Sequence, residues 1–520
     1  MSKSLKSALP YLLILIGSVF LYLSALGKTP VHLNQDELMF SLNAKTIAES
    51  GMDYYGNKFP FYFWHLGSFW ATPVIVYLDS IFLNFLPLSE ETIRVGSVFV
   101  ALLSIGLTMF LVQKIFKRKL LTLLAGFLTA TTPALFINSR LLLDNVYPIP
   151  FVLLWLIFLY HYIKTKNPLM FFVSGLSLGA GIHSYHAAKI MMPVYLVLSC
   201  LIFLPEFKKN FKAIGLFIFG FLVPIIIFLP WLKIHPDTLL NQVSYIGSLD
   251  STVEVQKGLL GVFNFRRLGD FASNYFTYFS PKILFISGDR SLIHSTRKVG
   301  AFLFPVVFLL VFGILETLRN KDKFLKLLLV GFLTYPIGPA LVNDPERISR
   351  GFVVIPFVIL LSIYGIKFLI SQRDKVFRYL VSFVVMVSVF QFFGFTLDYF
   401  GAYRERSYAW FNNDIGGVLE SSLKSTEIRG VNKIFLDEHI PFVNLYFEFY
   451  QRKLGIDAKD KWGFYNFNEQ DFSRFPKGSL VVVRRDHIDK PLDKIDQFEK
   501  IETIRELDGN ETFYIYYRDR

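Results

Sequence analysis

Long apolar blocks separated by short polar stretches fill the chain up to about residue 397. A helix needs roughly 20 apolar residues to cross the hydrocarbon core of a bilayer. The blocks therefore predict a polytopic α-helical membrane protein with about eleven spans. We expect the spans near residues 10–27, 92–113, 120–138, 146–163, 168–183, 190–204, 213–232, 300–318, 324–341, 352–370 and 377–397.

The pattern changes after residue 397, where charged residues become frequent and the long apolar blocks stop. Short β-type runs at 433–436, 480–483 and 512–517 predict strands in this region. We therefore divide the chain into a membrane domain, 1–397, and a small α/β domain, 398–520.

Clusters of Lys and Arg recur in alternate connections between the expected spans. They lie at 114–119, 164–166, 208–209, 319–326 and 373–378. Basic loops stay on the cytoplasmic side, so the pattern predicts a cytoplasmic N-terminus in the plasma membrane. The first loop (28–91), the long loop (233–299) and the α/β domain then lie outside the cytoplasm. Many later spans and the lack of a clear cleavage motif favour an uncleaved first span over a signal peptide.

The apolar stretch Trp70–Phe85 resembles a further span but conflicts with this topology. If it crossed the membrane, the basic cluster at 114–119 would move to the outer side. Pro73 and Pro87 near its ends also favour a broken element. We expect a juxtamembrane or re-entrant helix on the outer face.

Composition supports the membrane class and excludes several others. The chain is 53% hydrophobic and 17% aromatic, and its formal charge of +13 is expected mainly from cytoplasmic loops rather than from nucleic-acid binding. A single cysteine, Cys200, excludes an internal disulfide and a cysteine-based metal site. No phosphate-binding loop, dinucleotide fingerprint or serine-hydrolase elbow is present, so nothing indicates ATP use or serine hydrolysis.

Two adjacent acids, Asp36 and Glu37, follow the first span. Asn34 as N-cap and Glu37 three residues later would form a capping box, which is a purely structural interpretation. The alternative is a catalytic site on the outer face. Both interpretations are compatible if Glu37 caps the helix while Asp36 accepts a proton.

Further charged residues lie at the other expected outer junctions. Arg140 and Asp144 would share a helix face as a simple ion pair, or Arg140 would bind phosphate through its planar fork. His183 and His186 could bind metal, but interfacial packing is the more common role, and Lys189 is a candidate phosphate ligand.

The last two outer junctions end the long loop and precede the span at 352–370. The first contributes His294 and Arg297, and the second contributes Arg347 and Arg350. Each alone is an ordinary polar turn. Together, the outer junctions would suit an anionic, lipid-linked substrate whose phosphate lies at the membrane surface.

Several short motifs occur in an order that resembles the GT-C membrane glycosyltransferases of the protein O-mannosyltransferase and aminoarabinose transferase type. The motifs are Gln35-Asp36-Glu37, Tyr54-Tyr55-Gly56-Asn57, Ser139-Arg140 to Asp144, Gly175 to Gly179 leading to Tyr185, Phe279-Ser280-Pro281 with Gly288-Asp289, and Asn343-Asp344-Pro345 with Arg347 and Arg350. The resemblance spans about residues 10–400 and extends weakly into the outer domain.

This resemblance implies a transferase that takes a sugar from a polyprenyl- or dolichyl-phosphate donor and inverts the anomeric centre. Asp36 would deprotonate the acceptor hydroxyl, Glu37 would assist it, and Arg140 would hold the donor phosphate. Lys189, Arg347 and Arg350 are the other phosphate-ligand candidates. Substrate-binding candidates are Asp144, Tyr185, His65, His294 and Arg297.

Other features of this hypothesis stay open. No cofactor is indicated with certainty; a divalent metal is an alternative, with His65, His183 and His294 as loose candidates. The acceptor is a glycan, a lipid or a protein, although no region has the length for the β-trefoil insert of eukaryotic protein O-mannosyltransferases. Competing functions are a transporter or flippase of lipid-linked sugars and a non-catalytic assembly subunit. The absence of paired halves disfavours the transporter.

Overall fold

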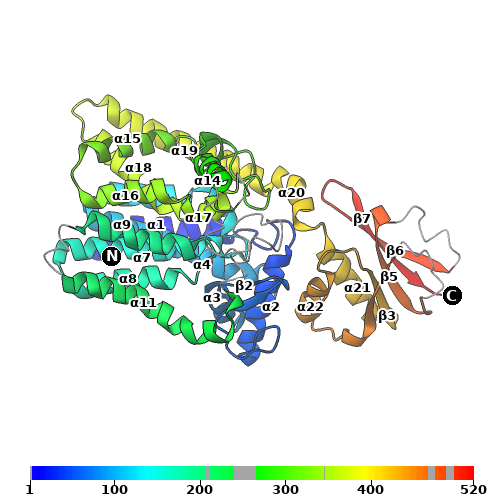
Figure 1. The fold of residues 1–520 in the computed structure, drawn as a ribbon. Coiled ribbons are helices and arrows are strands. Elements are labelled where there is room, and N and C mark those ends of the chain that lie inside the picture. Colours follow the sequence, from blue (N-terminus) through cyan, green and yellow to red (C-terminus); the bar gives the residue numbers. More distant parts are fainter. Residues whose placement is uncertain are drawn as a thin grey trace.

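The computed structural model describes residues 3–204, 211–238, 265–342, 344, 346–466, 475–487 and 497–519. A helical bundle and a smaller C-terminal domain with a β-sheet form the two ends of the molecule (Figure 1). The segment with α2 (Gln35–Ser50) and α3 (Pro73–Leu83) lies between them. The basic pair at 208–209, residues 239–264 of the expected long loop, and positions 343 and 345 lie outside the described residues.

Each expected span coincides with one helix or with two consecutive helices. The helices are α1 (Lys3–Leu23), α4 (Val95–Phe116), α5 (Lys119–Ala130) with α6 (Pro133–Asn138), α7 (Pro148–Thr165), α8 (Pro168–Gly181), α9 (Ala188–Ile202), α11 (Phe211–Ile234), α15 (Val306–Arg319), α16 (Lys323–Thr334) with α17 (Ile337–Ala340), α18 (Val354–Ile370) and α19 (Val376–Phe400). Both breaks coincide with a proline, Pro133 or Pro336, because proline cannot donate the helical hydrogen bond.

Four stretches of the described chain are long and apolar enough to cross a membrane, judged by length and composition. They are Thr92–Phe116, Asp144–Thr165, Phe211–Ile234 and Val376–Phe400. All of the expected spans are helical, as their bounds above show. Their number as membrane crossings stays a prediction.

Helices α8 and α11 approach each other closely because glycines lie at their contact. A Cβ atom at Gly175 would lie 2.0 Å from the carbonyl oxygen of Phe217, and one at Gly179 would lie 2.3 Å from that of Phe221. A four-residue step places both glycines on one helix face, as in closely packed membrane helices. The glycine motif noted in the sequence thus has a packing role.

Helix α3 fits the expectation for the ambiguous apolar stretch. Its 11 residues rise only about 16 Å, whereas the hydrocarbon core is about 30 Å thick. It packs against α2 and α4 beside the antiparallel hairpin of β1 (Phe63–His65) and β2 (Phe69–Ala71). The length of α3 agrees with a helix that does not cross.

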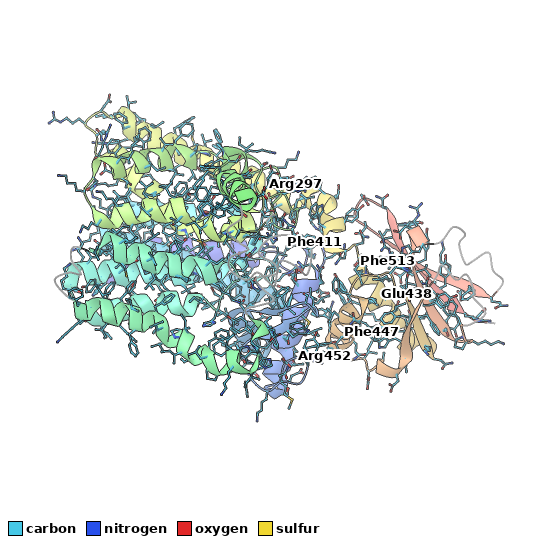
Figure 2. The ribbon with its side chains drawn as sticks, in the orientation of Figure 1. Arg297, Phe411, Glu438, Phe447, Arg452 and Phe513 are labelled. Atoms are coloured by element: carbon cyan, nitrogen blue, oxygen red, sulfur yellow. The ribbon has the colours of Figure 1, made fainter. Side chains whose placement is uncertain are left out.

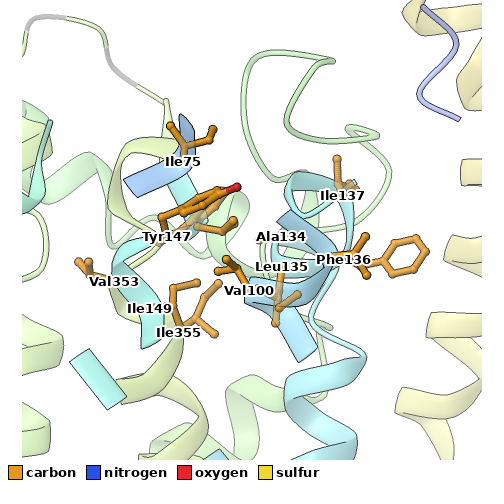
Figure 3. Packing of buried hydrophobic residues seen from close by; sticks show 14 of the residues in the cluster. Ile75, Val100, Ala134, Leu135, Phe136, Ile137, Tyr147, Ile149, Val353 and Ile355 are labelled. Atoms are coloured by element: carbon orange, nitrogen blue, oxygen red, sulfur yellow. The ribbon is translucent and has the colours of Figure 1, made fainter. Parts of the chain in front are cut away.

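Other short helical elements lie in the connections. They are η1 (Thr92–Arg94), η2 (Asp144–Val146), α14 (Phe265–Thr277), η4 (Lys282–Ile286), η5 (Ile348–Gly351), α20 (Ala402–Ser407) and η6 (Tyr408–Phe411). Figure 3 shows residues 134–137 of α6 packed near Val100 of α4 and Tyr147 after η2. This buried packing supports the turn that carries Arg140 and Asp144.

The C-terminal domain contains a five-stranded mixed sheet in the order β4-β3-β5-β7-β6. Its elements are α21 (Ile415–Arg429), β3 (Lys433–Asp437), α22 (Val443–Leu454), η7 (Lys459–Lys461), β4 (Trp462–Tyr465), β5 (Ser479–Arg484), η10 (Arg485–His487), β6 (Phe498–Arg505) and β7 (Glu511–Arg518). Strand β3 is parallel to β4 and β5, whereas β7 is antiparallel to β5 and β6. The predicted α/β domain and its three strands are confirmed.

The sequence pattern does not predict β4 and β6, the two edge strands of this sheet. Strand β6 carries Glu499, Lys500 and Glu502, and charged residues are typical of edges because they oppose pairing with another chain. Such a strand has no clear apolar alternation. The three strands that were predicted are the interior ones.

Helix α22 places the C-terminal domain against the start of α2. The hydroxyl of Tyr446 donates to the carbonyl oxygen of Leu33 at 2.7 Å, and the amide of Asn412 donates to Gln35 Oε1 at 2.9 Å. His32 Nε2 lies 2.9 Å from Glu506 Oε2. The C-terminal domain therefore supports the helix turn that carries Asp36.

Candidate functional site

The connections at the end of the bundle facing the C-terminal domain are joined by side-chain hydrogen bonds. The bonded pairs are Thr72 with Asp144, Tyr62 with His183, His294 with Asn138, and Asp289 with the backbone of Ser349. These pairs link the first loop to the connections after α6, α8 and α11, and onward to the turn before α18. The convergence of the five junctions at one end of the bundle is confirmed, while the identity of that end as the outer face stays a prediction.

Asp36 is an accessible carboxylate of this region. It lies in the first turn of α2, its side chain is 39% exposed, and its Oδ1 lies 2.8 Å from Nε2 of His65. His65, at the end of β1, is buried and packs against the rings of Phe40 and Phe69. Because Nε2 faces a carboxylate, we assign it the ring proton. His65 thus orients Asp36 while the carboxylate still reaches solvent.

Glu37 is buried and bonded on both carboxylate oxygens. Arg94 donates from Nε to Oε1 at 2.8 Å and from Nη2 to Oε2 at 3.2 Å, and the backbone N–H of Leu142 donates to Oε1 at 3.1 Å. The predicted capping box with Asn34 is present. Glu37 therefore anchors α2, and its side chain is enclosed by protein.

Arg140 does not pair with Asp144, because α6 ends before it. Its Nη1 donates to the carbonyl of Tyr22 at 2.6 Å, and its Nη2 donates to those of Ser24 and Thr29, both at 2.8 Å. The side chain is fully buried. The two terminal nitrogens of Arg140 are thus occupied by carbonyls at and after the end of α1, while its buried Nε has no partner among the described residues. The geometry favours a structural role, and the role predicted at the donor phosphate stays a prediction.

Asp144 instead accepts a hydrogen bond from Thr72 Oγ1 at 2.8 Å. It lies within electrostatic reach of Asp36, His65 and Lys189. This carboxylate therefore belongs to the same polar cluster as Asp36 and Lys189.

Lys189, at the start of α9, has a buried ammonium group for which the described residues provide no hydrogen-bond acceptor. The ammonium lies 4.6 Å from the centre of the Tyr62 ring. A buried ammonium without an acceptor is costly, so this site favours an anionic ligand. Tyr185 lies nearby, within electrostatic reach of both Asp144 and Arg350.

The packing interpretation of the two nearby histidines is supported. His183 Nδ1 lies 2.9 Å from the hydroxyl of Tyr62, and His186 packs on the ring of Phe69. Burial, followed by the charges of Lys189 and His65, lowers the pKa of His186 well below its ordinary value. His186 therefore stays neutral. In the part of the chain that the structure describes, His65, His183 and His294 each have a different partner and form no shared metal site.

Arg347 and Arg350 converge on Asp344. The Oδ2 atom of Asp344 lies 3.1 Å from Arg347 Nε and 2.8 Å from Arg350 Nη2. The Nη1 atom of Arg350 is buried and has no hydrogen-bond partner among the described residues. Arg350 therefore retains a donor for a further anion.

His294 lies within electrostatic reach of both this cationic turn and Asp36. Burial lowers the pKa of His294, Arg347 and Arg350 act in the same direction, and Asp289 and Asp36 oppose them. The ring is held through Nδ1, which lies 2.6 Å from Asn138 Oδ1. The charges of the first loop and of the turn before α18 thus act on one imidazole.

Arg297 does not join this cluster. Its guanidinium donates to the carbonyl of Arg290 and lies 5.0 Å from the ring of Trp410. Figure 2 places Arg297 at the end of the bundle that faces the C-terminal domain. It contacts the segment that leads into that domain, and we do not assign it to substrate binding.

Two residues important to the site escaped sequence analysis. Arg94, the partner of Glu37, stands at the start of an apolar span, where a lone arginine is itself a signal. Thr72, the partner of Asp144, carries no such signal because a threonine before a helix is ordinary.

Comparison with known proteins agrees with this arrangement. Residues 71–234 match the family described as dolichyl-phosphate-mannose-protein mannosyltransferase. The structure of ArnT from Cupriavidus metallidurans bound to undecaprenyl phosphate is similar, with a TM-score of 0.61, 11% identity, and 97% of each chain covered. The chain has the GT-C fold.

The apo structure of the same ArnT is also similar, with a TM-score of 0.56, 11% identity, and 98% of each chain covered. No curated protein sequence matches the chain. The resemblance to GT-C membrane glycosyltransferases is confirmed at the level of the fold. In this GT-C chain the fold positions Asp36, Asp144, Lys189 and Arg350 around one end of the bundle.

Proposed function

We propose that this chain is an inverting glycosyltransferase that moves a sugar from a polyprenyl-phosphate donor to a hydroxyl group of an acceptor at the outer face of the membrane. The observation that carries the proposal is the meeting of an accessible carboxylate, Asp36, with the unsatisfied buried ammonium of Lys189 around Asp144. A base and an anion-binding group that both interact with Asp144 suit transfer from a lipid phosphate.

Asp36 takes the proton from the acceptor hydroxyl as its oxygen attacks the anomeric carbon. The bond between that carbon and the phosphate oxygen breaks, and the lipid phosphate leaves with the bonding electrons. One base is sufficient for a single inverting displacement. His65 holds Oδ1 of Asp36, so the carboxylate is oriented before the acceptor arrives.

Lys189 and Arg350 bind the donor phosphate and stabilise the charge that develops on it. Each presents a buried nitrogen without a partner among the described residues, so ligand binding supplies the missing acceptor. Arg347 supports Arg350 through Asp344. Tyr185 lies within electrostatic reach of Arg350, and His294 lies within electrostatic reach of both arginines. Glu37 and Arg140 act as positioning residues.

Resemblance to the other proteins supports the donor class. The similar ArnT structure contains undecaprenyl phosphate, and the matching family is named for a dolichyl-phosphate donor. The buried Lys189 of this chain favours the same kind of anion. The acceptor is a glycan, a lipid or a protein whose hydroxyl group reaches Asp36.

Transfer from undecaprenyl phosphates carrying labelled sugars, assayed in membranes, tests the base. Asp36→Asn keeps the shape of the side chain but cannot accept the proton, and loss of a general base reduces rates about 10²–10⁴-fold. Glu49→Gln, an exposed acid on the same helix, is the matched control and should transfer normally. Undiminished transfer by Asp36→Asn would exclude Asp36 as the base.

Binding of undecaprenyl phosphate tests the anion site. Lys189→Met should raise the dissociation constant at least 10-fold, because the methyl thioether fills the space without charge. Lys282→Met, at an exposed lysine, is the control. Equal affinity in the two variants would remove Lys189 from the donor site.

Cysteine labelling tests the orientation in a Cys200→Ala background. An impermeant thiol reagent added to intact cells should label Asn57→Cys and leave Lys117→Cys unlabelled, since the two exposed positions lie at opposite ends of the bundle. Labelling of Lys117→Cys alone would invert the assigned topology.

A further inference from the structure

A second polar cluster, far from Asp36 in the sequence, lies in the C-terminal domain. Asp437, His439 and His487 each offer one possible ligand atom, and these atoms all lie within 4.8 Å of one another. Asp437 is fully buried, whereas the two imidazoles are partly exposed. None of these residues was singled out by their sequence pattern.

The sheet topology brings the cluster together. Strands β3 and β5 are adjacent and parallel, so their C-terminal ends meet at the same edge. Asp437 is the last residue of β3, His439 follows two residues later, and His487 follows β5 in η10. In open α/β sheets this edge is where ligands commonly bind. Figure 2 labels Glu438, which follows Asp437, and Phe513, which pairs with the last residue of β5.

The environment of Asp437 favours a cation. Its Oδ1 lies 3.0 Å from Nδ1 of His439 and accepts from the backbone N–H of the same residue at 3.0 Å, and its Oδ2 lies 2.6 Å from Nδ1 of His487. No Lys or Arg pairs with Asp437 in the described ranges. The nearby guanidinium of Arg484 pairs with Asp486 instead. A buried carboxylate is costly unless a positive charge compensates it.

We propose that Asp437, His439 and His487 bind a divalent transition-metal ion, of which Zn²⁺ is the best fit. Two imidazole nitrogens and one carboxylate oxygen are common zinc ligands, and metal–ligand bonds of about 2.0–2.2 Å place tetrahedral ligand atoms about 3.3 Å apart. His439 Nδ1 lies 3.0 Å from Oδ1 of Asp437 and His487 Nδ1 lies 2.6 Å from its Oδ2, and one ligand atom from each residue fits within 4.8 Å of the others. Small shifts of these side chains bring three ligand atoms to the tetrahedral spacing. Because the two imidazoles are partly exposed, a water molecule can supply the fourth ligand of the zinc ion.

The ion connects the sheet to the surface that supports the candidate active site. The loop after Asp437 leads directly into α22, whose Tyr446 donates to the carbonyl of Leu33. Binding of an ion at the start of this loop restrains the beginning of α22. The site does not depend on the proposed transferase activity.

Metal content of the full-length protein in detergent tests the proposal. After chelation and exposure to Zn²⁺, the wild type should hold one more equivalent than the double variant His439→Gln/His487→Gln, measured by mass spectrometry of the metal. His161→Gln, at an exposed histidine of α7, is the matched control and should match the wild type. Asp36→Asn is a second control: it detects any other ion bound near His65, and it should retain the Zn²⁺ equivalent that the double variant loses.

Co²⁺ substitution identifies the ligand geometry. The wild type should show visible absorption bands of a tetrahedral N/O site that the double variant lacks. His439→Cys exchanges one zinc ligand for another, so it should retain the equivalent even if the Gln variants fold poorly. Equal metal content and equal Co²⁺ spectra in wild type and double variant, or no Zn²⁺ bound by the wild type, would overturn the proposal.

Discussion

Asp36 and Glu37 are neighbours in the sequence, yet their carboxylates enter opposite environments. Successive residues of a helix point about 100° apart, so one acid turns toward His65 and solvent while the other turns into the protein. Asp36 is 39% exposed and Glu37 is fully buried against Arg94. Only Asp36 is therefore available to a substrate, and Glu37 holds the turn in place.

Substitution of Glu37 should affect stability more than chemistry. Glu37→Gln leaves the buried guanidinium of Arg94 without its counter-charge, and breaking a buried ion pair costs about 3–5 kcal/mol. The thermal unfolding midpoint of the detergent-solubilised protein should fall clearly below that of Asp36→Asn. A Glu37→Gln variant with wild-type stability but no transfer would instead indicate a direct catalytic role.

Removal of His65 should reduce the rate without weakening donor binding. His65→Ala frees Asp36 to adopt other rotamers, and misplacement of a reacting group by about 1 Å can cost about 100-fold in rate. Transfer assays should show a lower kcat with an unchanged KM for the lipid donor. His65→Gln, which retains an N–H donor, should recover part of the rate, and equal rates for His65→Ala and wild type would argue against positioning.

Arg140→Lys separates a structural role from phosphate binding. A lysine ammonium cannot reproduce the planar fork that reaches the carbonyls of Tyr22, Ser24 and Thr29. Each buried carbonyl left unsatisfied costs about 1–3 kcal/mol, so the unfolding midpoint should fall. Affinity of the folded variant for undecaprenyl phosphate should match the wild type. Normal stability with weakened binding would return Arg140 to the donor site.

The pH dependence of stability should contain a contribution from His294. Burial lowers its pKa, so below the ordinary value of 6.5 the unfolded chain binds a proton that the folded chain resists. Its contribution is complete above about pH 6.5 and is lost as the pH falls through the window between the ordinary and the lowered pKa. The unfolding midpoint should fall less between pH 7 and pH 5 for His294→Gln than for the wild type. An identical fall in both proteins would contradict this assignment.

Much of the architecture could be predicted because it depends on local patterns. Apolar blocks of span length became helices from α1 to α19, and the alternating runs became β3, β5 and β7. Short helix α3 was recognised from its conflict with the charge pattern and from its prolines. Edge strands β4 and β6 were not recognised, because charged or short edges lack an apolar alternation.

The candidate site was predictable only in part. The sequence indicated Asp36, Lys189 and Arg350 as chemically suitable, and it indicated the capping box of Asn34 and Glu37 correctly. It could not show that Arg140 is occupied by backbone carbonyls more than 110 residues earlier in the chain. Nor could it show that β3 and β5 bring His487 to Asp437, because residues 50 positions apart meet only through sheet pairing.

The sequence by itself determined the class of protein, the apolar helices, the α/β character of the C-terminal domain and the acid at the start of α2. Each of these follows from the solvent preference and spacing of neighbouring residues. The tertiary structure alone decided which charged groups are satisfied and which are free to act. That decision depends on partners from distant segments, such as Arg94 for Glu37 and His65 for Asp36, because burial and hydrogen bonding are properties of the folded chain.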